Sequence, residues 1–201
     1  AYWRILWTTG VSIVLDILSL FAIYYNDVLP VAVVNLVCRT YLVSLLSIGV
    51  SSLVYIKTDA MLASKQGYKI RRSYITTIAL IGVILIYVLP VRYYCSDDKS
   101  IMYTYGPSTI VAFTAVFFFL FYTVVVMQIA KAVINQRRRT AVLMWIGILL
   151  FTAIFQLFYR DRLLIGFASA MGAMILYIRL ENPDINLDRE TGVFNQHAFL
   201  L

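Results

Sequence analysis

The chain has 201 residues, of which 62% are hydrophobic, 15% aromatic and 13% charged, and its formal net charge is +7. Soluble domains carry about 25% charged residues, so this composition excludes a soluble globular domain, and it also excludes a disordered, collagen-like or disulfide-rich chain. The apolar residues come in runs of about twenty, the length that a helix needs to cross about 30 Å of hydrocarbon.

Six apolar segments are predicted to be membrane helices. A β-barrel would show alternating segments of about ten residues, whereas the fourth segment here is almost continuously apolar, so helices are favoured. We therefore expect an all-α polytopic membrane protein, a bundle of six transmembrane helices, with a further helix upstream of Ala1 left open. In chain order the segments are residues 5–25, 31–56, 74–91, 109–129, 141–159 and 163–178.

The first two segments each contain an ionisable residue, Asp16 and Arg39. Such a group at mid-membrane costs about 2.5 to 3.5 kcal/mol on insertion scales, so each needs a partner. Asp16 lies nine residues before Tyr25 and Arg39 nine residues after Pro30, which places both at a similar depth at about 1.5 Å per residue. We predict an ion pair that clamps the helical hairpin. The alternative is that Asp16, Asn35 and Arg39 line a polar pocket or switch.

Lysine and arginine residues are concentrated on one side of the predicted bundle. Cytoplasmic loops accumulate these residues, so both termini are expected in the cytoplasm. The basic patches lie directly at helix ends, and no nucleic acid is needed to explain them. The cytoplasmic set contains Arg4, Lys57, Lys65, Lys69, Arg71, Arg72, Lys131, Arg137, Arg138, Arg139, Arg179 and Arg189, and the opposite set contains Arg92, Lys99, Arg160 and Arg162.

The predicted outer loops combine tyrosines with charged residues. Tyrosines at this level typically form an interfacial belt. The alternative is a surface that binds an unknown small-molecule or lipid signal, formed by Arg92, Tyr93, Tyr94, Arg160 and Arg162.

The sixth segment carries small residues at helical spacing, among them Gly166, Ala170, Gly172 and Ala173. Small residues let helix backbones approach closely, which favours tight packing within the bundle. The alternative is a homodimer face that moves during signalling.

The membrane part offers no catalytic constellation. Its sequence contains no histidine, because His197 lies in the tail, and this excludes a zinc-protease motif, a histidine metal cluster and a Ser-His dyad in the bundle. We therefore expect no metal or cofactor in this segment, and no catalytic residue.

The composition changes after Ile178, which divides the chain into a membrane part (1–180), a short linker (181–187) and a tail (188–201) that we interpret as the start of a truncated domain. Asn182 and Pro183 are typical of a helix N-cap followed by proline at the first helical position.

The tail reads Asp188-Arg-Glu-Thr-Gly-Val-Phe-Asn, and it resembles the opening of a GGDEF diguanylate cyclase domain, Asp-x-Leu-Thr-Gly-Leu-x-Asn-Arg. Asp188, Thr191, Gly192 and Asn195 match in register. The departures are Glu190 for leucine, Val193 for the second leucine and Gln196 for arginine.

This resemblance implies a bacterial cyclase of the inner membrane, in which two domains, each with GTP and magnesium, condense two GTP to cyclic di-GMP. Asn182, Pro183 and the matched tail residues would couple the membrane module to the catalytic domain, whose GTP and metal sites would lie after Leu201. The alternatives from other classes are a small transporter, permease or channel subunit, and a passive membrane anchor.

Overall fold

The computed structural model describes residues 2–63, 72–97, 99, 101–132, 134, 136–159 and 165–181. Most of them are helical, as the sequence predicts. The helices are α1 (Tyr2–Tyr24), α2 (Val31–Ala63), α3 (Arg72–Val88), α4 (Pro107–Ile129), α5 (Gln136–Phe158) and α6 (Ile165–Leu176), and α6 continues into a π-helical turn, η1 (Tyr177–Glu181).

Four of these helices are long and apolar enough to cross a membrane, namely α1, α2, α4 and α5. The apolar parts of α3 and of α6 with η1 are shorter. α3 ends at Val88, three residues before the predicted end, because Pro90 follows and the residue before a proline disfavours helical geometry. Pro107 starts α4, where its missing N–H costs no hydrogen bond.

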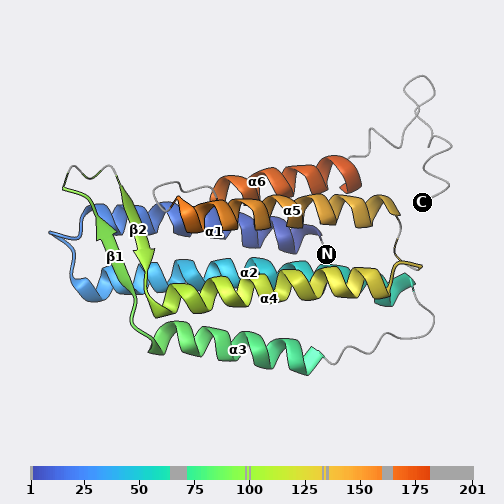
Figure 1. The fold of residues 1–201 in the computed structure, drawn as a ribbon, viewed down its shortest axis with the longest axis horizontal. Helices are drawn as coiled ribbons and strands as arrows, with labels where there is room; N and C mark the ends of the chain where they lie inside the picture. Colours follow the sequence, from blue (N-terminus) through green and yellow to red (C-terminus); the bar gives the residue numbers. More distant parts are fainter. Residues whose placement is uncertain are drawn as a thin grey trace, which may run out of the picture.

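The helices lie lengthwise beside one another (Figure 1). α2 has the most extensive contacts, packing against α1 and α4, while α3 packs on α4 and α2. α6 lies at the opposite edge, where it packs mainly on α5 and also on α1. Figure 1 also places the start of α1 and the end of α6 at the same end of the bundle.

The bundle has an apolar core and an apolar outer surface. The side chains of Trp145 and Phe119 are at most about 1% exposed. By contrast, those of Trp7, Phe121 and Phe151 are each about 70% exposed. Large exposed apolar side chains on most of the helices are what a lipid-facing surface requires. The composition and this surface are compatible with a membrane protein.

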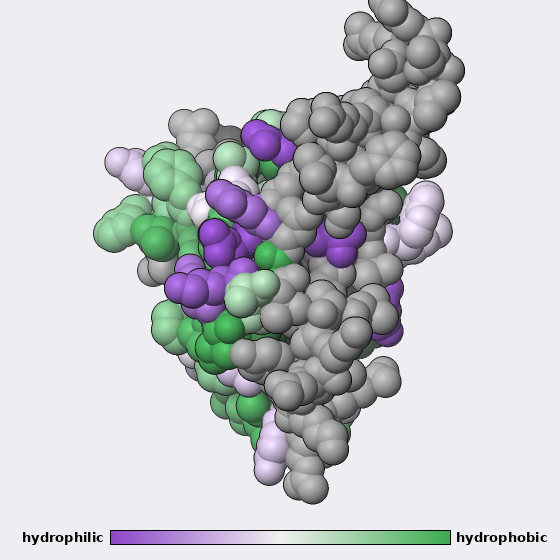
Figure 2. Space-filling view, turned by 90° about the vertical axis from the view of Figure 1, so that its right-hand side faces the viewer, coloured by the Kyte–Doolittle hydropathy of each residue, from purple (hydrophilic) through white to green (hydrophobic). Residues whose placement is uncertain are grey.

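Hydrophilic residues gather at the end of the bundle where α1 begins, seen in Figure 2 beside hydrophobic flanks. The described basic residues at or near the helix termini of this end include Arg4, Lys57, Lys131, Arg138, Arg139 and Arg179.

A short β-hairpin covers the other end of the bundle, and the sequence did not predict it. β1 (Arg92–Cys95) pairs antiparallel with β2 (Met102–Tyr105), with Arg92 opposite Tyr105. Tyr94 and Tyr103 face each other across the strands, and their rings stack at 5.2 Å between centroids. Such aromatic cross-strand pairs stabilise hairpins. The hairpin contacts the ends of α1 and α4, so this end of the bundle is partly closed.

Candidate functional site

The predicted ion pair between Asp16 and Arg39 is wrong. The guanidinium of Arg39 instead donates hydrogen bonds to two backbone carbonyls at the end of α3, those of Tyr87 and, at 3.1 Å, Leu89. The last carbonyls of a helix have no partner in the helix and carry its negative dipole end, so a cation binds well there. Because α3 ends early, this negative end lies within reach of Arg39.

Asp16 lies on α1 and lines a small cavity of about 30 Å³. Its Oδ1 is buried and has no hydrogen-bond partner. The cavity is walled by α1, α2, α4, α5 and the second strand of the hairpin, through Asp16, Ser19, Leu20, Ile23, Tyr41, Leu42, Phe113, Gln156, Tyr103 and Thr104.

Tyr41 and Gln156 are two of the polar residues that line this cavity. Tyr41 on α2 directs its hydroxyl toward the Asp16 carboxylate. Gln156 on α5 has a buried Oε1, and like Asp16 Oδ1 this oxygen has no hydrogen-bond partner. One turn before Asp16, the hydroxyls of Ser12 and Ser44 join α1 to α2 at 3.0 Å. A polar cavity therefore exists, although it is not the one the sequence predicted.

The predicted third member of the polar group, Asn35, is half-buried on α2 and is not one of the residues that line this cavity. The predicted set of Asp16, Asn35 and Arg39 is therefore split. Asp16 faces the cavity, and Arg39 caps α3.

Asp16 also touches the sixth helix. A Cβ atom placed on Gly166 would lie 3.0 Å from Asp16 Oδ2. The glycine thus leaves room for the carboxylate against the backbone of α6. This contact connects the polar cavity to the helix that leads into the tail.

The other small residues of α6 are used mainly within the chain. A Cβ on Gly172 would lie 1.7 Å from the indole Cδ1 of the buried Trp145 on α5, so the two helices meet closely there. Ala173 is buried, whereas Ala170 is exposed. The contacts of Gly166 and Gly172 agree with the prediction of tight packing within the bundle.

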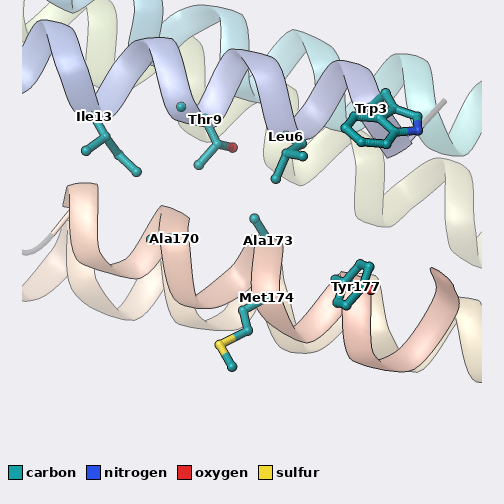
Figure 3. Close-up of a pocket in the computed structure, with 9 residues that line it drawn as sticks. Trp3, Leu6, Thr9, Ile13, Ala170, Ala173, Met174 and Tyr177 are labelled. Carbon is teal, nitrogen blue, oxygen red and sulfur yellow. The ribbon is translucent and has the colours of Figure 1, made fainter. Parts of the chain in front are cut away.

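A groove of about 540 Å³ separates α1 from α6 at the end opposite the hairpin. Figure 3 shows Trp3, Leu6, Thr9 and Ile13 of α1 on one side and Ala170, Ala173, Met174 and Tyr177 on the other. Its lining is mostly apolar, which suits contact with lipid chains.

The predicted outer surface is only partly within the described residues. Arg92, Tyr93 and Tyr94 alternate along β1, so Arg92 and Tyr94 are exposed while Tyr93 packs against the core of the bundle. Arg160 and Arg162 lie outside the described residues, as do the predicted coupling residues Asn182, Pro183, Asp188, Thr191, Gly192 and Asn195.

Lys99, between the strands, ties the hairpin to α1. Its ammonium lies 3.1 Å from the carbonyl oxygen of Tyr24, the last residue of α1, and 3.1 Å from Asp27 Oδ2. The hydrogen bond with Asp27 raises the pKa of Lys99 above its ordinary value.

The sequence interpretation missed Tyr41 and Gln156. Gln156 is the one amide side chain in the segment 141–159, which is otherwise almost wholly apolar. An amide at that position is a usable signal, because buried amides are almost always hydrogen-bonded. Tyr41 gives no such signal, since tyrosines occur throughout the predicted helices and loops.

Comparison with protein-family models, curated proteins and solved structures finds no match to this chain.

Proposed function

We propose that residues 1–180 form the membrane signal-input module of a diguanylate cyclase, which controls the synthesis of cyclic di-GMP from two GTP. The observation that carries the proposal is the tail sequence, where Asp188, Thr191, Gly192 and Asn195 match the opening of a GGDEF domain. This opening follows η1 after only a short linker, so the last membrane helix would lead directly into the catalytic domain.

The contacts of α6 support a route for the signal. The cavity extends from Thr104 of the hairpin to Asp16, and Asp16 in turn touches Gly166. A change in the hairpin or in the cavity would therefore alter the packing of α6 and pass along it to η1. A π-helical turn such as Tyr177–Glu181 is a common feature of functional sites in helices.

The charge distribution supports the orientation that the proposal needs. We place both ends of this multi-pass segment on the cytoplasmic side of a bacterial inner membrane, because basic residues collect on that side. The described basic residues at helix termini are more numerous at the end where α1 begins than at the hairpin end, which holds Arg92 and Lys99. GTP would then be present on the side where the tail emerges.

The active unit would be a homodimer, since a GGDEF enzyme brings two domains together. Gly166 and Gly172 do not supply a continuous dimer face, because both pack inside the chain. GTP and magnesium would bind the domain that follows the tail, and the membrane module itself would contain no catalytic residue.

A direct assay tests the proposal. The full-length protein, purified in liposomes, is supplied with GTP and Mg²⁺, and cyclic di-GMP is measured by mass spectrometry. We expect product, together with a Gly-Gly-Asp/Glu-Glu-Phe sequence after Leu201. A chain that stops soon after Leu201 and makes no product would contradict the proposal.

Two alternatives from other classes have their own tests. The cavity at Asp16 would suit a small transporter, permease or channel subunit, and solute flux into liposomes would then depend on Asp16. The second alternative is a passive membrane anchor. Replacing residues 1–180 with an unrelated dimerising membrane anchor would then leave the regulation of the cyclase unchanged, whereas the input-module proposal requires that regulation to be lost.

A further inference from the structure

Two of the residues that line the cavity at Asp16 carry buried oxygens that accept hydrogen bonds and have no donor. They are Asp16 Oδ1 from α1 and Gln156 Oε1 from α5. The Tyr41 hydroxyl from α2 adds a third oxygen. Buried polar atoms in folded proteins almost always have a partner, so two unpartnered oxygens at one cavity indicate an occupant.

The charge at the cavity is not balanced by a basic side chain. None of the described residues that line it is lysine, arginine or histidine. Among the described residues, the ion pair is formed by Asp27 and Lys99 and does not involve Asp16. Arg39 is hydrogen-bonded to the end of α3. The other polar residues that line the cavity are Ser19, Tyr41, Tyr103, Thr104 and Gln156, none of which carries a positive charge, and the backbone at Gly166 beside Asp16 Oδ2 is neutral.

The size of the cavity limits what can bind. About 30 Å³ is room for an occupant the size of one water molecule. A proton on Asp16 Oδ1 that is donated to Gln156 Oε1 would satisfy both unpartnered oxygens but would leave the cavity empty. A water molecule beside an ionised Asp16 would leave the carboxylate charge unbalanced in an apolar surrounding.

The oxygen donors limit the charge of the occupant. Carboxylate, amide and hydroxyl oxygens are ligands for hard cations. A divalent ion would keep one uncompensated positive charge beside a single carboxylate, and no group of three or more His, Cys, Asp or Glu side chains exists among the described residues. A monovalent ion leaves the site neutral.

We propose that this cavity binds one Na⁺ ion through Asp16 Oδ1, Gln156 Oε1 and the Tyr41 hydroxyl. Tyr103 and Thr104 of β2 complete the cavity wall on the side of the hairpin. This claim goes beyond the proposed function, and it does not depend on any cyclase activity.

Ion-dependent stability tests the site in the full chain reconstituted in phosphatidylcholine nanodiscs. Thermal unfolding is followed by tryptophan fluorescence while NaCl replaces choline chloride at constant ionic strength and constant pH. A ligand that binds only the folded state raises the midpoint with its concentration. We expect Na⁺ to raise the midpoint and choline to leave it unchanged.

Variants test whether the effect of Na⁺ on the unfolding midpoint arises at this cavity. Asp16→Asn should abolish the response to Na⁺, and Gln156→Leu should raise the Na⁺ concentration required by about tenfold, since one ligand oxygen is lost. Asp27→Asn makes the same chemical change at a carboxylate outside the cavity, and it should keep the full response. If Asp16→Asn does not fold, Gln156→Leu alone decides whether the affinity depends on the cavity.

The relaxation of ²³Na⁺ measured by NMR on the same nanodiscs gives a readout that does not depend on stability. Saturable line broadening that is lost in Gln156→Leu supports the site. Stability that responds to pH but not to Na⁺ would overturn the proposal in favour of a proton. A Na⁺ response that persists in both cavity variants would also overturn it.

Discussion

At the scale of single residues, the two membrane charges have separate structural roles. Arg39 binds carbonyls of α3 and Asp16 faces a cavity, so the two side chains share no partner. The position of each residue along its helix was readable from the sequence. The sequence did not show the direction in which each side chain leaves its helix, nor the early end of α3. These two features decide which groups Asp16 and Arg39 contact.

Because Asp16 and Arg39 share no partner, we predict that substitutions at the two positions have additive effects on the free energy of unfolding. Arg39→Gln should lower the free energy of unfolding by about 1.5 to 3 kcal/mol, because charged hydrogen bonds to the Tyr87 and Leu89 carbonyls weaken. In the double variant with Asp16→Asn, the two changes should add to within about 0.5 kcal/mol. The measurement is reversible unfolding in mixed micelles. A coupling energy clearly above that limit would mean that Asp16 and Arg39 interact, as the ion pair predicted from the sequence requires.

Gly172 provides a second prediction at this scale. Gly172→Ala should destabilise the bundle by about 1 to 3 kcal/mol, because the new methyl group would overlap the Trp145 ring, with its Cβ only 1.7 Å from Cδ1. Gly147→Ala on α5 is the matched control, since its Cβ meets nothing within 4 Å. Equal effects of the two substitutions on the unfolding midpoint would argue against this packing.

At the scale of elements, the sequence predicted the helices well and the hairpin not at all. Long apolar runs leave few alternatives to a helix in lipid, and the prolines at positions 30, 90 and 107 lie at or next to helix boundaries. β1 and β2 have only four residues each, too few for their alternation to stand out in a loop rich in tyrosine. Their pairing depends on the packing of the neighbouring helix ends.

Lys99 predicts how the hairpin responds to pH. The hydrogen bond with Asp27 raises the pKa of Lys99 above the ordinary lysine value of 10.5. The stabilisation that the contact between Lys99 and Asp27 gives to the hairpin is therefore fully present below pH 10.5. It is lost as the pH rises through the higher pKa that Lys99 has in the folded state. Titration of the Nζ signal by NMR should show this raised pKa in the native chain, and Asp27→Asn should return it toward 10.5. An unchanged titration in Asp27→Asn would contradict the contact.

The contact between α1 and α6 predicts coupling between two residues far apart in sequence. Gly166→Ala should destabilise the bundle by about 1 to 3 kcal/mol, because its methyl group would lie 3.0 Å from Asp16 Oδ2. Removing that oxygen with Asp16→Ala should reduce the cost of Gly166→Ala, giving a coupling energy of at least about 0.5 kcal/mol in the unfolding cycle. Strictly additive effects would mean that Asp16 and α6 are independent.

At the scale of the whole molecule, composition was sufficient to predict a mostly helical chain with helices long and apolar enough to cross a membrane. The net charge of +7 is distributed unevenly, and in the described residues the basic side chains favour the end where α1 begins. The candidate cavity could be only partly predicted. Asp16 was identified from its cost in lipid, whereas Tyr41 and Gln156 join it only through the packing of α1, α2 and α5.

The most direct test of the account is an insertion series in the full-length protein between Leu180 and Asp184, with cyclic di-GMP synthesis measured in liposomes. If α6 transmits the signal as a rigid helix, inserting one to four residues rotates the following domain by about 100° per residue. We predict activity that varies with helical phase and recovers near one full turn. No product at all, or activity indifferent to insertion length, would contradict the account.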